Sequence, residues 1–126
     1  MKFYSSTIKN FFLQEFFTSG LVHWVLIGSL VLNIVNWGLI AFFIRPVDFS
    51  VILHYNVYFG VDVIGPWWQI YFLPFIGLII LGINTILGYL FYQKKERIVA
   101  HLLMLATFIA QIGIAVAVAS LLMINY

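Results

Sequence analysis

The sequence predicts an all-α membrane protein with three transmembrane helices, and two observations lead to this fold class. The first is a set of three long apolar stretches, at residues 20–44, 72–92 and 98–124, where one bilayer crossing needs roughly 20 apolar residues. The second is composition: 64% of the residues are hydrophobic and 8% are charged, against about 25% charged in soluble domains. Because backbone polar groups in hydrocarbon must bond within the protein, these stretches are expected to be helices. A chain of 126 residues then forms a single membrane domain.

Residues 1–19 predict an amphipathic helix lying in the headgroup layer before the first span. Apolar side chains alternate here with Lys, Ser, Asn and Gln, as they do in interfacial helices. The apolar side chains are Phe3, Ile8, Phe11, Phe12, Phe16 and Phe17. The segment is either a membrane anchor or a helix that docks on a partner subunit. A cleaved signal peptide is not expected, because the apolar run that follows is too long and no cleavage site follows it.

Residues 45–71, between the first and second spans, predict an ordered loop. Residues 51–63 are rich in β-branched and aromatic side chains, which favours one or two short strands, in the manner of a β-hairpin, turning near Gly60. Strand alternation divides the side chains between two sides. One side is expected to carry Tyr55, Val57 and Phe59, and the other His54, Asn56 and Tyr58. Together with Asp62, the second side is the candidate partner surface.

The start of the second span has its own signals. Pro66 is expected at the first helical position, where its missing N–H is not needed. Trp67, Trp68 and Tyr71 follow it and are typical of the aromatic belt at a membrane interface. Pro74 then falls inside the expected helix, where proline removes a backbone hydrogen bond and is expected to bend the chain.

The loop also carries a resemblance. It contains the run LHYNVYFGVD at residues 53–62, followed by IGPW at residues 64–67. This pattern resembles a segment of small bacterial integral membrane proteins without an assigned function, and the likeness covers the chain from the first span onward. The resemblance implies a location in the bacterial cytoplasmic membrane. It implies no activity, cofactor or site residue.

The positions of the basic residues predict the orientation of the chain. Basic residues in short loops tend to stay cytoplasmic. Two lysines precede the first span and three basic residues lie at 94–97, whereas loop 45–71 holds one arginine against two aspartates. The N-terminus and residues 93–97 are therefore expected in the cytoplasm, with loop 45–71 and the C-terminus outside. The six basic residues form no basic face, so nucleic acid is not an expected partner.

Amide side chains inside the spans predict a polar contact near the membrane midplane. At about 1.5 Å per residue, Asn33, Asn84 and Gln111 all come close to the middle of their spans. Amides exposed to lipid are costly, so these three are expected to face one another, with Asn36 one turn further out. Two interpretations remain: hydrogen bonding that packs the helices, or a polar pathway or small-molecule site. The spans contain no charged residue, which leaves little for a proton relay or ion-coupled pump.

Small residues form a stripe along the third span, at alternating spacings of four and three. They are Ala106, Ala110, Gly113, Ala117 and Ser120. Such a stripe lets a neighbouring helix backbone come close. It is either an internal packing face of the bundle or the contact face of a homodimer, and the sequence leaves both open.

The functional expectation is a non-enzymatic membrane protein that acts through protein contacts, as an accessory subunit or a homo-oligomer. The alternative is a small transporter or channel with the midplane amides as its polar site. A third reading is a membrane enzyme acting on lipid through His54 and Asp62, although no motif fixes their geometry. No catalytic, cofactor or metal site is expected, and the chain contains no cysteine. An accessory subunit should bury the midplane amides within one protomer. In a homo-oligomeric channel, several protomers should instead surround a pore at the level of these amides.

Overall fold

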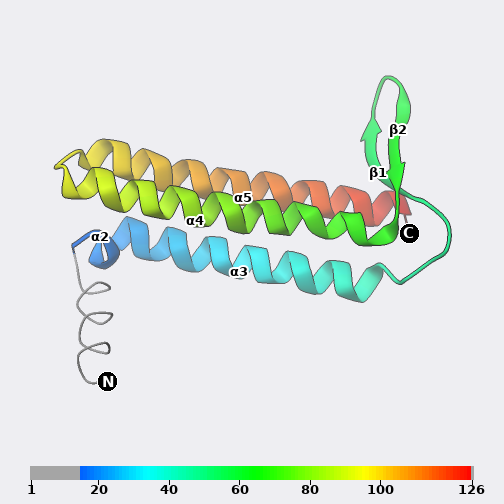
Figure 1. Cartoon of the computed structure of the whole chain (residues 1–126), viewed down its shortest axis with the longest axis horizontal. Coiled ribbons are helices and arrows are strands. Elements are labelled where there is room, and N and C mark those ends of the chain that lie inside the picture. The colour runs from blue at the N-terminus through cyan, green and yellow to red at the C-terminus, as the bar shows by residue number, and fades with distance from the viewer. Residues whose placement is uncertain (1–14, 126) are drawn as a thin grey trace.

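The computed structural model describes residues 15–125 and consists of three long helices side by side (Figure 1). They are α3 (Gly20–Phe43), α4 (Phe72–Gln93) and α5 (Arg97–Asn125), and they alternate in direction. Each is long and apolar enough to cross a membrane, which confirms the predicted fold class. α5 packs along both other helices, whereas α3 and α4 touch each other much less. We call the end of the bundle that carries the two strands the hairpin end, and the opposite end the turn end.

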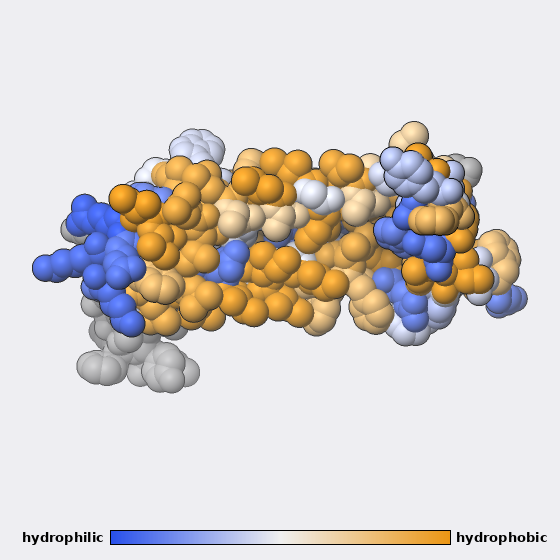
Figure 2. All heavy atoms as spheres, turned by 90° about the horizontal axis from the view of Figure 1, so that it is seen from above, coloured by the Kyte–Doolittle hydropathy of each residue, from blue (hydrophilic) through white to orange (hydrophobic). Residues whose placement is uncertain are grey.

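The bundle surface has the polarity of a membrane protein. Figure 2 shows a broad apolar band along the helices, with hydrophilic residues gathered at the two ends. The large side chains that face outward in this band are apolar, as Ile34, Ile86 and Ile109 illustrate. An exposed apolar surface that surrounds a whole bundle is what lipid tails require, because they offer no partner for polar groups.

The second span begins earlier than the sequence analysis predicted. A 3-10 helix, η1 (Trp67–Tyr71), leads directly into α4, so the apolar span runs Trp67–Gln93. Pro66 precedes η1 as its N-cap, and Pro74 is the third residue of α4. The hydrogen bond that proline cannot donate therefore falls at the junction of η1 and α4, and Pro74 does not interrupt the middle of the span. The irregular part of the span is η1, the 3-10 segment that precedes α4.

At the turn end, a short helix closes the bundle. This helix, α2 (Glu15–Thr18), falls within the interfacial helix predicted for residues 1–19, of which residues 1–14 lie outside the described residues. Phe16 is fully buried, and its ring meets Tyr89 and Tyr92 of α4. A Cβ at Gly88 would come within 3.1 Å of the Phe16 ring. Phe16 therefore fills a space in the bundle core, where the sequence analysis expected it on an interfacial helix.

The connection between α4 and α5 is tight. Lys95 has a positive φ of 64°, and the backbone N–H of Glu96 donates to the carbonyl of Phe91 across 2.9 Å. A left-handed residue that follows a helix in this way reverses the chain within a few residues. The basic residues predicted to lie in a short loop are thus gathered at one end of the bundle, and Arg97 lies over the ring of Tyr92 at 5.4 Å.

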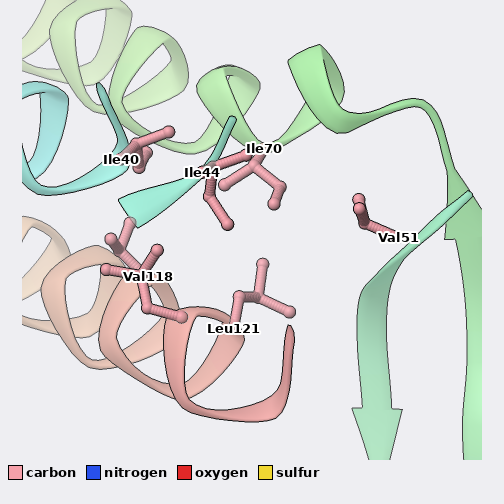
Figure 3. Packing of buried hydrophobic residues seen from close by; sticks show 7 residues of the cluster. Ile40, Ile44, Val51, Ile70, Val118 and Leu121 are labelled. Carbon is pink, nitrogen blue, oxygen red and sulfur yellow. The ribbon is translucent and has the colours of Figure 1, made fainter. Parts of the chain in front are cut away.

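The hairpin end is held by a second apolar core (Figure 3). It combines side chains from the end of α3, the first strand, η1 and α5. They are Ile40, Ile44, Val51, Ile70, Val118, Leu121 and Leu122. Burying one such side chain stabilises by about 1.5–3 kcal/mol in water. The cluster fixes the base of the strands to the end of α3, to η1 and to α5.

Two strands project sideways from that core. β1 (Val51–Asn56) and β2 (Gly60–Gly65) form an antiparallel hairpin, which stands roughly perpendicular to the helices (Figure 1). The turn is fixed by Gly60, with a φ of 78°, and by Asn56, whose side-chain oxygen accepts from the backbone N–H of Tyr58 at 2.8 Å. Glycine is the residue that adopts this φ at no steric cost. The predicted strands and the turn near Gly60 are confirmed.

Candidate functional site

The midplane contact is built from side chains of α3 and α5 and two backbone carbonyls of α4. The Asn33 side-chain NH₂ donates to the carbonyl oxygen of Pro74 at 2.8 Å and to the side-chain oxygen of Gln111 at 3.4 Å. The Gln111 NH₂ donates to the carbonyl oxygen of Gly77 at 2.7 Å. Trp37 donates its ring N–H to the Asn33 oxygen at 2.9 Å. One side chain from α3 and one from α5 therefore bond across all three helices, and we call these five residues the amide cluster.

The local sequence of α4 makes room for this cluster. Gly77 has no side chain, and a Cβ there would lie 2.9 Å from the Asn33 nitrogen and 3.0 Å from the Gln111 oxygen. A carbonyl oxygen has two lone pairs, so the Pro74 and Gly77 carbonyls can accept an amide from a neighbouring helix. Asn33 and Gln111 are both fully buried, which would be costly if they lacked these partners.

Asn84 does not join the amide cluster, contrary to the sequence prediction. Its side chain is half-buried, and it makes no hydrogen bond among the residues that the structure describes. The cause is the early start of the second span at Trp67. This start shifts the helix so that Gly77 reaches the level of Asn33, and Asn84, seven residues later, lies about 10 Å further toward the turn end.

Asn36 is buried as predicted but is left without a partner. Its side-chain nitrogen has no hydrogen bond within residues 15–125, and the same holds for the hydroxyl of Ser29. These two residues flank Asn33 at about one turn on either side along the buried face of α3. The hydroxyl of buried Thr107 is satisfied by its own helix, through the carbonyl of Leu103 at 2.9 Å. Polar groups thus extend along the interior beyond the amide cluster, without any charged group among them.

The stripe of small residues lies on the outside of the bundle. The buried face of α5 is formed by Ala100, Met104, Thr107, Gln111, Val118, Leu121 and Leu122. None of the stripe residues belongs to it: Ala106, Gly113 and Ser120 are exposed, and Ala110 and Ala117 are half-buried. A Cβ added at Gly113 would meet no atom within 4 Å. Internal packing uses a different face of α5, and contact with a second copy stays a prediction for the stripe.

The hairpin brings the predicted partner residues together in part. His54 and Asp62 form a close pair, with 2.6 Å between the imidazole Nδ1 and a carboxylate oxygen, and both are exposed. Asn56 is used inside the turn. Tyr58 lies at the tip and is 91% exposed. Strict alternation fails, because irregular pairing lies on both sides of His54 and the strand ends at Asn56, before Val57 and Phe59.

Asn125 is a structural residue that the sequence analysis did not single out. Its amide oxygen accepts from the Ile52 N–H at 2.7 Å, and its amide nitrogen donates to the Ile52 carbonyl at 2.7 Å. The side chain thereby pairs with β1 as a neighbouring strand would. An asparagine at the polar end of a span was the available signal, but its partner depends on how the hairpin folds back onto α5.

Histidines and acidic residues form no larger constellation in the described part of the chain. No group of three or more potential metal ligands occurs there. His23 lies on the exposed side of α3, and the ring of His101 lies against Tyr92 with a centroid distance of 6.3 Å. Comparison of the sequence with protein-family models, with curated proteins and with solved structures finds no match.

Proposed function

We propose that this protein is a non-enzymatic subunit of a membrane assembly, acting through contacts with other membrane proteins. The observation that carries the proposal is the amide cluster, whose polar groups bond to one another inside a single protomer. An accessory subunit is expected to bury these amides in this way, whereas a pore would leave them facing a shared axis. The choice of an accessory subunit over a homo-oligomeric channel rests on this geometry.

The hairpin supplies a surface for such contacts. Val57 and Phe59 are each 84% exposed, beside Tyr58 at 91%. These three residues, which we call the hairpin tip, project beyond the footprint of the helices (Figure 1). Exposed apolar patches mark sites of protein or membrane interaction, and tyrosine and phenylalanine are common anchors at interfaces. A pair of strands held at its base and open at its tip suits binding to a neighbouring subunit.

The arrangement of charge supports a definite orientation. The three basic residues at 94–97 lie at the turn end, and the hairpin end holds Arg45 against Asp48 and Asp62. We propose on the positive-inside tendency that the turn end faces the cytoplasm. The hairpin tip would then meet its partner on the outer side of the cytoplasmic membrane.

One observation favours a second candidate function, that of a small transporter or channel. The side-chain nitrogen of Asn36 and the hydroxyl of Ser29 are buried without partners in residues 15–125. Buried polar groups are normally hydrogen-bonded, so another conformation of the bundle could pair these atoms with water or a polar solute. The amide cluster lies between Ser29 and Asn36 and its own hydrogen bonds are closed. This argues that a conformation open to water or a solute is not the dominant one.

The proposal is tested by the mass of the native particle after mild detergent extraction. The wild type is expected to run as a complex larger than one protomer. Replacing the hairpin tip by V57S, Y58S and F59S together should reduce it to the protomer, because the apolar contact is lost. F49S is the matched control, since Phe49 is 70% exposed and lies outside the hairpin. A particle whose mass is that of a single protomer in the wild type would contradict the proposal.

A further inference from the structure

A groove lies under the hairpin, at the corner where the strands leave the bundle. It has a volume of about 420 Å³ and lies between β1 and the hairpin-end portions of α4 and α5. Its apolar walls include Leu53, Val57, Leu73, Ala117, Leu121 and Ile124. Ala117 and Ser120 belong to the stripe of small residues, so the groove lies over the hairpin-end part of that stripe. In a membrane, the helix side of this groove opens into lipid tails.

The polarity of the groove changes along the membrane normal. The walls supplied by the helices are almost entirely apolar, whereas the strand side carries His54 and Tyr55. Asp62 is paired with His54 at 2.6 Å and is partly exposed, so its carboxylate adds a negative charge at this rim. The other charges described near the hairpin end are Arg45 and Asp48, and the excess of carboxylates favours a cationic group there.

We propose that the groove binds a phospholipid with a zwitterionic headgroup that carries an ammonium group. The tail lies against Leu73, Ala117 and Leu121, inside the hydrocarbon layer. The ammonium group meets the Asp62 carboxylate, and the Tyr55 hydroxyl donates a hydrogen bond to a phosphate oxygen. A phospholipid has an apolar tail and a polar headgroup, which match the apolar helix walls and the polar strand side of the groove in the same order along the membrane normal.

The hairpin also decides against a transmembrane helix as the occupant. Residues of β1 line the same groove as Leu121 and Ile124 near the end of α5, and the hairpin stands across that end of the bundle (Figure 1). A straight helix lying along α5 in the groove would therefore run into the strands. A lipid ends at the level of its headgroup and therefore fits beneath the strands. The groove shares Val57 with the hairpin tip, but Tyr58 and Phe59 do not line it, so the lipid site and the proposed protein contact are tested by different variants.

Selectivity should come from the headgroup and not from the tail. Lipid tails are as apolar as the groove walls, so the hydrophobic effect gives no preference for one lipid over another. An exposed opposite-charge pair favours binding by up to about fivefold. The structure therefore predicts a preference of about this size for a zwitterionic over an anionic phospholipid.

The experiment uses the full chain in bilayer discs containing equal amounts of phosphatidylethanolamine and phosphatidylglycerol. After gentle release, native mass spectrometry measures the lipid that remains bound. The wild type should retain a single phospholipid and favour phosphatidylethanolamine by up to about fivefold. A117F should lose this lipid, because the ring fills the groove. A106F is the matched control, since Ala106 lies on the same stripe about 16 Å deeper and should retain it.

A second variant separates lipid recognition from general damage to the fold. D62N leaves the groove open but removes the carboxylate, so lipid should still bind and the preference for phosphatidylethanolamine should disappear. An unchanged preference in D62N would overturn the assignment of the headgroup site. Equal lipid retention in A117F and the wild type would overturn the groove site. The site would also be overturned if the wild type carried no lipid and A117F instead lost a bound second protein chain, because the occupant would then be a protein.

Discussion

Gly77→Ala is the sharpest perturbation of the amide cluster, because the added methyl group enters it directly. The new Cβ would lie 2.9 Å from the Asn33 nitrogen, 3.0 Å from the Gln111 oxygen and 3.1 Å from a methyl group of Ile114. All three distances are shorter than ordinary van der Waals contact, so the amides must move away from the Pro74 and Gly77 carbonyls. The variant tests whether these close contacts hold the bundle together.

The expected loss in the free energy of unfolding combines two destabilising contributions and one stabilising contribution. Overpacking of a well-filled core costs about 1–3 kcal/mol, and each interhelical hydrogen bond in a membrane contributes about 0.6 kcal/mol. Alanine recovers up to about 1 kcal/mol through its greater helix propensity than glycine. The net loss in the free energy of unfolding should therefore be about 1–3 kcal/mol for Gly77→Ala.

Gly82→Ala provides the control on the same helix. A Cβ at Gly82 meets no atom within 4 Å, so this variant should keep the wild-type stability or gain up to about 1 kcal/mol. Unfolding in mixed micelles, followed by tryptophan fluorescence, measures both variants, and Trp37 reports directly because its ring N–H bonds to Asn33. If Gly77→Ala proves as stable as Gly82→Ala, the close packing around the cluster is refuted.

Three further predictions concern other parts of the chain. N33L and Q111L should cost less together than the sum of the two single changes, because their side chains touch, whereas N33L and N84L should be additive within about 0.5 kcal/mol; unfolding free energies of the singles and doubles decide this. N125L should speed amide exchange of β1 by about thirtyfold through the loss of its two hydrogen bonds to Ile52, at roughly 1 kcal/mol each. S120A, which alters only a bond within α5, should leave the exchange unchanged. Single cysteines introduced at Ser50 and Glu96 should react with an impermeant reagent from opposite sides of intact cells, and labelling of position 96 from outside would reverse the proposed orientation.

The three spans could be predicted from the sequence because they depend on local composition. A run of apolar residues longer than about 20 has few alternatives in a membrane, and the β-branched residues between the first two spans likewise predicted the strands. Where each helix begins depends on finer geometry. The second span begins with the 3-10 segment Trp67–Tyr71, earlier than predicted. As a result Gly77, and not Asn84, lies at the level of Asn33.

The contacts that determine the site are tertiary, and a single sequence does not encode them visibly. Carbonyl groups of Pro74 and Gly77 accept the amides, and no pattern of side chains announces a backbone acceptor. Asn125 pairs with Ile52 across 73 positions of sequence. Irregular pairing around His54 changed the two sides of the hairpin, and strict alternation cannot anticipate such a shift.

Whether water reaches the interior is the most direct test of the proposed function. Ser29 is fully buried next to the amide cluster, and serine to cysteine is a small change in a chain that has no cysteine of its own. The measurement is the rate at which S29C reacts with a small water-soluble thiol reagent in native membranes, relative to V57C at the exposed hairpin tip. An accessory subunit with a closed amide cluster should show rapid labelling of V57C and no labelling of S29C. Labelling of S29C at a comparable rate would mean a water-filled path through the bundle, and the protein would then be a transporter or channel.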